Sequence, residues 1–100
     1  MSYDQLKMKQ VTLQILRDYA ITLNREQTLI ALQSDRYPVT VNDLYVLATG
    51  KYPGAFAGTS KTQVKQLICR MGCAVTRKNR TDTINGMFFK QAPEAILGQI

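Results

Sequence analysis

Residues 59–71 carry lysine, threonine and glutamine side chains in a pattern that suits contact with nucleic acid. Lysine and arginine bind phosphates or the acceptor atoms of guanine, and glutamine pairs with the edge of adenine. The segment favours a helix that turns Val64 and Leu67 inward. Its outward polar positions are then Lys61, Thr62, Lys65, Gln66 and Arg70. Thr59 and Ser60, just before it, can donate to a phosphate together with the free N–H groups at a helix start. Solvated surface helices are often rich in the same residue types, so this face alone does not decide the function.

A second basic cluster follows at Arg77, Lys78 and Arg80, three cations within four positions. We expect residues 77–85 to form the polar tip of a β-hairpin, where cations suit phosphate contact or entry into a minor groove. A polar loop charged by chance is the alternative. We favour phosphate contact, because an exposed tip has no structural need for three cations. Ile84 is unusual in such a tip, and we expect it to pack back, or to wedge into a groove or a partner.

The distribution of charge supports a polyanionic partner. Residues 1–50 carry five Lys or Arg against five Asp or Glu, whereas residues 51–100 carry eight against two. The second half therefore holds the whole net charge of +6. Asymmetry of this kind is typical of proteins that bind nucleic acid.

The elements that must position these side chains follow from periodicity. Apolar residues at i, i+3, i+4 and i+7 predict a helix over 61–71, which Gly72 ends. Residues 73–77 alternate as a strand, and 87–90 form the return strand. Between them we expect a loop over 78–86, with Asn85-Gly86 as its tight turn. Phe88 and Phe89 are adjacent, so they must face opposite sides of that strand.

The N-terminal half is predicted to be mainly helical. Residues 4–23 form a first helix whose apolar face is broad, so it is buried on more than one side or shared with a second copy. That face includes Leu6, Leu13, Leu16, Ala20 and Leu23. Asn24 is a break and an N-cap, with Gln27 at the capping-box spacing. A second helix then runs over 25–34 with Leu29, Ile30 and Leu32 turned inward. One continuous helix over 4–34 is the alternative.

The middle of the chain is predicted to hold a short strand and a third helix. Residues 39–41 form the strand, and Thr40 caps a helix over 42–49. Gly50 ends this helix in a left-handed cap. Residues 51–58 are a loop that Phe56 anchors to the core. Tyr45 and Tyr52 are also expected to pack there, rather than to form a stacking platform for single strands.

The order helix, short strand, helix, helix, strand, loop, strand resembles the winged helix-turn-helix family of DNA-binding proteins over residues 24–91. The resemblance is carried by the helix 60–71, by Gly72, and by the strands 73–78 and 86–90. It implies a mainly α fold with a small β-hairpin, in the α+β class, with an extra N-terminal helix. A single domain 1–100 would comprise a dimerising helix over 1–24, a winged-helix core over 25–91 and a tail over 92–100.

The same resemblance implies how DNA is bound. The helix 61–71 enters the major groove, with the N-terminal positions Lys61, Thr62, Lys65 and Gln66 facing the bases, and the hairpin 77–86 lies on the backbone. One departure is the loop 51–58, which is longer than the turn of a simple helix-turn-helix. Winged-helix proteins as a family accept longer turns.

Nothing in the sequence favours catalysis or a bound cofactor. The chain has no histidine, and its acids are few and dispersed. Cys69 and Cys73 are too few for a zinc site, and we expect two reduced thiols that pack as small apolar groups. We expect a protein that is not an enzyme, without metal, cofactor or small-molecule ligand.

The location is expected to be cytoplasmic, and nucleoid-associated in a bacterium or phage-infected cell. The most apolar run, 11–23, is interrupted by Gln14, Arg17 and Asp18, so no membrane span is expected. The first residues show no signal-peptide pattern.

The sequence therefore predicts a homodimeric protein that binds double-stranded DNA. Its role would be transcription regulation, or accessory and architectural work in replication or recombination. Small basic chains of this kind are often found in phages, plasmids and other mobile elements. Two alternatives remain open: a protein-interaction module that acts as adaptor or inhibitor of a nucleoprotein complex, and an RNA-binding protein.

Overall fold

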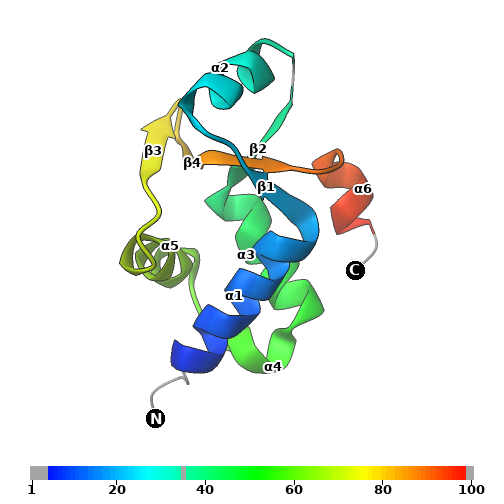
Figure 1. Cartoon of the computed structure of the whole chain (residues 1–100). Coiled ribbons are helices and arrows are strands. Elements are labelled where there is room, and N and C mark those ends of the chain that lie inside the picture. Colours follow the sequence, from blue (N-terminus) through cyan, green and yellow to red (C-terminus); the bar gives the residue numbers. More distant parts are fainter. Residues whose placement is uncertain (1–4, 35, 99–100) are drawn as a thin grey trace.

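The computed structural model of the chain describes residues 5–34 and 36–98. Its helices pack around a four-stranded antiparallel sheet (Figure 1). In chain order the elements are α1 (Gln5–Tyr19), β1 (Ala20–Thr22), α2 (Arg25–Gln33), β2 (Tyr37–Thr40), α3 (Val41–Lys51), α4 (Pro53–Phe56), α5 (Lys61–Arg70), β3 (Val75–Lys78), β4 (Thr81–Phe89) and α6 (Pro93–Leu97). The expected α+β class is confirmed.

β4 is the central strand, because it pairs along both of its edges. Thr83 lies opposite Thr76 of β3 on one edge and opposite Thr40 of β2 on the other. Farther along, Ala20 of β1 lies opposite Phe89. β1 and β3 therefore share one edge of β4, and β2 takes the other.

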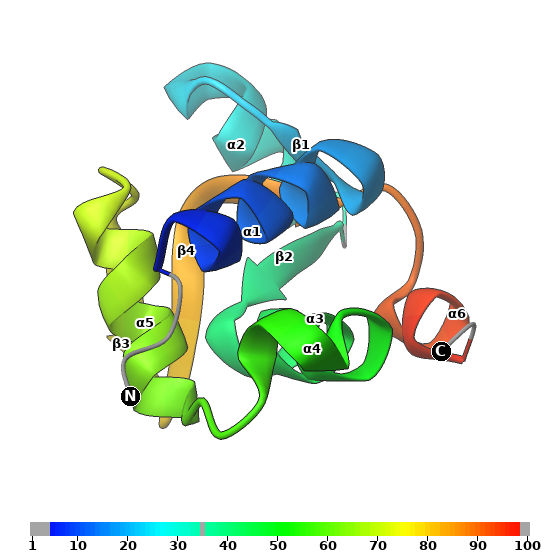
Figure 2. The ribbon, with the colours of Figure 1, turned by 90° about the horizontal axis from the view of Figure 1, so that it is seen from below.

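The main core fills the space between one face of this sheet and the helices α1, α3 and α5 (Figure 2). Its fully buried side chains include Ile15, Leu44, Leu47, Phe56, Val64, Ile68 and Ile84. The burial of Phe56 confirms that it anchors the segment before α5 to the core. The prediction that residues 51–58 are a loop is wrong in part, since Lys51 ends α3 and Pro53–Phe56 form the short helix α4. Ile84 packs back into the core, which was one of the two outcomes expected for it.

The two adjacent phenylalanines of β4 are both buried, on opposite faces of the strand. Phe89 belongs to the main core, and Phe88 lies outside that cluster. Helix α2 lies apart from the other helices, on the far side of the sheet (Figure 1). Among the residues that the structure describes, none from α2 contributes to the main core.

The first helix is shorter than predicted. It ends at Tyr19, and residues 20–22 form the strand β1 instead of a last helical turn. The amide of Lys90 donates to the Tyr19 carbonyl at 2.9 Å, so the chain joins the edge of β4 as soon as the helix ends. Leu6 and Leu13, expected on the inward face, are exposed. The predicted start at Asp4 lies outside the described residues.

Helix α2 begins as predicted but packs differently. The Asn24 carboxamide oxygen accepts from the Gln27 amide at 2.8 Å, and the Gln27 side chain accepts from the Asn24 amide at 3.2 Å. This capping box confirms two helices rather than one. The inward orientation predicted for the larger apolar residues is wrong, since Leu29, Ile30 and Leu32 are 57%, 58% and 53% exposed. Of its own residues, the helix buries only the small Ala31.

Helix α3 is longer at both ends than predicted. Val41 is its first residue rather than the end of a strand, and the Thr40 hydroxyl accepts from the Asp43 amide at 3.0 Å as the expected cap. Gly50 does not end the helix, which continues to Lys51. The Lys51 ammonium donates to the Tyr19 hydroxyl, a contact that holds this last turn against α1.

The predicted turn of the hairpin is also wrong. The strands β3 and β4 meet at Asn79 and Arg80, whose φ angles of +51° and +65° are those of a two-residue type I′ turn. Asn85 and Gly86 lie inside β4, where pairing with β3 carries Ile84 into the core. Gly86 has a φ of +77°, and a Cβ there would lie 3.2 Å from the Leu23 carbonyl oxygen.

The end of α5 confirms the role predicted for Gly72. This residue has a φ of +90°, and its amide donates to the Cys69 carbonyl. The amide of Cys73 donates to the Ile68 carbonyl, which completes a Schellman cap. Because the backbone of Cys73 belongs to this cap, the strand β3 begins two residues later than predicted, at Val75.

In the described part of the chain, no helix has both the length and the apolar character that crossing a membrane requires.

Candidate nucleic-acid interface

Helix α5 is held in place by a capping box and by two buried apolar side chains. The Ser60 hydroxyl accepts from the Gln63 amide at 3.2 Å, and the Gln63 side chain accepts from the Ser60 amide at 2.7 Å. Val64 and Ile68 are fully buried. The hydroxyl predicted to bind a phosphate therefore already serves as the helix cap.

The outward face of α5 is largely as predicted, with one addition. Thr62, Gln66 and Arg70 are exposed. Cys69 is exposed as well, so the prediction that both thiols pack inward is wrong for this one. Cys69 follows Gln66 by three residues and Thr62 by seven. Side chains at these spacings share one face of a helix, so the spacing in the sequence already placed Cys69 on the exposed face with Gln66 and Thr62.

Burial distinguishes the second cysteine. Both thiols are free, but Cys73 is half-buried and packs against the core. Burial raises the pKa of the Cys73 thiol, and the neighbouring Cys69 thiol raises it further. Among the residues described, no three His, Cys, Asp or Glu side chains come together as a metal site.

An acidic residue that the sequence did not single out joins α5 to the hairpin. The Asp82 carboxylate lies 3.2 Å from the Lys65 ammonium and 3.6 Å from the Arg77 guanidinium. The Asp82 side chain is only 18% exposed. Each of these partly exposed pairs contributes at most about 1 kcal/mol to stability, so the effect is mainly geometric. The carboxylate also offsets part of the positive charge of two predicted DNA contacts.

The three hairpin cations do not form one cluster. Arg77 lies opposite Asp82 in the sheet register, on the face that turns toward α5. Lys78 is the next residue along β3, so it projects from the opposite face. Arg80 lies in the turn. Sequence spacing could not show this, because it depends on the register of β3 against β4.

Lys61 and Arg80 come together instead, in a polar cleft of about 390 Å³. The start of α3, residues 40–43, and Asp82 also line this cleft. Two cations beside a helix start form a site suited to an anion such as a phosphate. The carboxylates of Asp43 and Asp82 in the same cleft weaken that attraction.

Thr59 has no access to a ligand. Its side chain is buried, and its hydroxyl has no hydrogen-bond partner in the described part of the chain. Its carbonyl accepts from the Tyr45 hydroxyl at 2.9 Å. Thr59 thus fixes the approach to α5, and the phosphate contact predicted for its side chain is wrong.

Comparisons of the chain with protein-family models, with curated proteins and with solved structures found no match.

Proposed function

We propose that this chain binds double-stranded DNA through α5 and the β3–β4 hairpin, as a winged helix-turn-helix protein. The order α2, β2, α3, α5, β3, β4 supports this assignment, as does the pairing of β2 with the edge of β4 that faces away from the hairpin. The observation that carries the proposal is the polar cleft where Lys61, Arg80 and the start of α3 meet beside the exposed face of α5.

The proposal divides the contacts between two groups of residues. Thr62 and Gln66 reach base edges, with Arg70 farther along the helix. Lys61 and Arg80 bind phosphates, because they share the cleft at the start of α5. Lys65 and Arg77 contribute less, since Asp82 pairs with both. No chemical reaction is assigned to the chain, and its role is transcription regulation or an architectural or accessory task in replication or recombination.

The expected dimer through the N-terminal helix stays a prediction. The exposed Leu6 and Leu13 of α1 support it. Sedimentation equilibrium of the wild type and of a Leu6→Asp, Leu13→Asp variant would test it.

The first experiment is fluorescence anisotropy of a labelled duplex of random sequence, titrated at several salt concentrations. We expect saturable binding, with an affinity that falls log-linearly as salt rises. The double variant Lys61→Ala, Arg80→Ala should bind more weakly and flatten that slope by about 2. The matched control is Arg36→Ala, Lys90→Ala, which removes the same charge from two exposed residues next to the start of β2 and the end of β4, away from α5.

The outcomes separate the alternatives. Equal losses in the two double variants would mean that net charge, and not this interface, attracts DNA. Absence of binding at low salt would contradict the proposal. Competition by structured RNA stronger than by duplex DNA would favour the RNA-binding alternative.

A further inference from the structure

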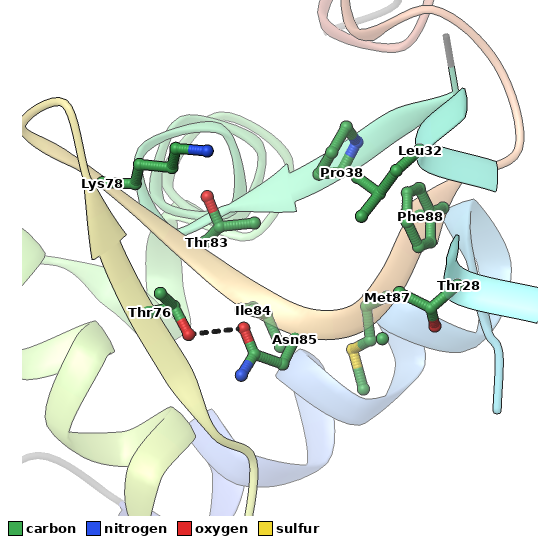
Figure 3. Close-up of a pocket in the computed structure, with 11 residues that line it drawn as sticks. Thr28, Leu32, Pro38, Thr76, Lys78, Thr83, Ile84, Asn85, Met87 and Phe88 are labelled. Carbon is green, nitrogen blue, oxygen red and sulfur yellow. Dashed lines mark hydrogen bonds between the residues drawn. The ribbon is translucent and has the colours of Figure 1, made fainter. Parts of the chain in front are cut away.

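An apolar groove lies between α2 and the hairpin, on the face of the sheet away from the main core (Figure 3). It has a volume of about 350 Å³. Leu32 of α2 forms one wall, Pro38 and Phe88 form part of the floor, and Thr83 and Lys78 lie at the end nearest the hairpin turn. The size and apolar lining are those of a site that takes side chains of a partner or a small ligand.

The polar and charged residues that line the groove indicate the chemistry of its binding partner. Lys78 is the one charged side chain among the described residues that line it. The Thr76 hydroxyl donates to the Asn85 side-chain oxygen at 2.7 Å, which leaves the Asn85 amide nitrogen as a further donor. An occupant must therefore supply apolar groups for the floor and negative charge for Lys78.

The apolar surface continues from the groove onto α2. Leu29 lies three residues before Leu32, and both are more than half exposed. Arg25 lies four residues before Leu29 and seven before Leu32, so it shares their side of the helix. Contiguous apolar surface flanked by charge marks a site for a macromolecular partner.

The backbone of the groove floor excludes one mode of binding. β4 is paired along both edges, so an extended peptide cannot add a strand to it. An occupant that lies over β4 therefore binds through side chains, as an amphipathic helix does in a groove. A second copy of this chain is disfavoured, because it would bring another Arg25 and another net charge of +6 toward Lys78.

We propose that this groove binds an amphipathic helical segment of an acidic partner protein. Two apolar side chains spaced four residues apart occupy the groove between Leu32 and Phe88. Acidic side chains that flank them pair with Lys78 and Arg25. The groove opens on the face of the sheet opposite α5 and shares no residue with the DNA contacts proposed above; Lys78, which the sequence predicted to bind DNA, lines the groove instead.

The test is a selection from a displayed library of random 16-residue peptides on the purified full chain. We expect a consensus with two apolar residues four apart and acidic flanks. A synthetic peptide of that consensus should bind Leu32→Asp at least tenfold more weakly. The matched control is Val46→Asp, an apolar-to-acidic change at an exposed residue of α3 that belongs to no proposed interface, and this variant should bind as the wild type does.

Charge reversal provides a second arm. Lys78→Glu should weaken the acidic peptide at least tenfold, and a peptide with lysines in place of its acids should recover binding to that variant. Leu32 is exposed, so these variants should keep the thermal unfolding temperature of the wild type within a few degrees. Recovery by the swapped peptide would not occur if Lys78→Glu simply unfolded the protein.

Several results would overturn the proposal. The selection could yield no consensus or a basic one, and either result would contradict it. So would a consensus peptide that binds Leu32→Asp as tightly as the wild type. A wild-type dimer that Leu32→Asp converts to a monomer would show that a second copy fills the groove. DNA binding by Leu32→Asp should equal that of the wild type, so failure of this proposal leaves the proposed DNA interface untouched.

Discussion

Helices α2 and α5 begin in the same way and end up in opposite situations. Each starts with a capping box, Asn24 with Gln27 and Ser60 with Gln63. Helix α5 buries two apolar residues completely and is tied to the hairpin through Asp82. Helix α2 leaves three large apolar residues exposed over the far side of the sheet. Local signals therefore determine where a helix begins, whereas its surroundings determine which face is covered.

The largest expected difference between the two helices is in core packing. Ile68→Ala in α5 should lower the free energy of unfolding by about 2–5 kcal/mol, because the site is fully buried. Ile30→Ala in α2 should change it by about 0.5 kcal/mol or less, since that side chain is 58% exposed. Urea denaturation of the two variants measures both values. Equal losses would mean that α2 is covered in solution.

The next effect concerns how α2 is held over the sheet. The Gly86 carbonyl accepts from the Leu23 amide at 2.8 Å, just before α2 begins. Gly86→Ala should cost about 1–3 kcal/mol, because its positive φ and the nearby Leu23 carbonyl both oppose a Cβ. Gly54→Ala is the control, since open space surrounds that position. Thermal unfolding of both variants tests this, and a neutral Gly86→Ala would contradict the strand geometry.

A smaller effect, on affinity for DNA, is expected when Lys65 of α5 and Arg77 of the hairpin lose their acidic partner. Asp82→Asn removes the carboxylate between Lys65 and Arg77, so affinity for duplex DNA should rise roughly threefold to tenfold. Stability should fall by less than about 1 kcal/mol, since these pairs are partly exposed. Asp18→Asn on α1 makes the same chemical change far from the interface, and anisotropy titrations of both variants separate local from overall charge. Unchanged affinity in Asp82→Asn would argue against DNA contact by this face.

The smallest effect is a difference in rate between the two thiols. Burial raises the pKa of Cys73, so less of this thiol is ionised at neutral pH. Because the thiolate is the reactive form, the alkylation rate of Cys73 should rise about tenfold for each unit by which the pH is raised, as long as the pH stays below that pKa. Cys69 is exposed on the face of α5, so saturating duplex DNA should slow its alkylation and leave that of Cys73 unchanged. Mass spectrometry after timed N-ethylmaleimide treatment measures both rates. Equal protection of the two thiols would point to a change in the whole fold.

Much of the fold followed from local patterns in the sequence. The apolar spacing of α5, the stop at Gly72 and the capping box of Asn24 with Gln27 predicted helix positions to within a few residues. The hairpin turn was misplaced because Asn85-Gly86 is a strong turn dipeptide. Pairing of Val75 with Ile84 buries apolar side chains in the core, and this gain places the turn at Asn79-Arg80 instead.

The sequence by itself determined the α+β class, most of the helices, the basic second half and the exposed polar face of α5. Each depends on composition or on spacing along one element, so no contact between distant residues is needed. Only the tertiary structure decided that Lys61 meets Arg80, that Asp82 joins Lys65 to Arg77, and that Lys78 faces the groove under α2. These contacts depend on the register of β3 against β4 and on which helices cover each face of the sheet. Both follow from the packing of segments that lie far apart in the chain.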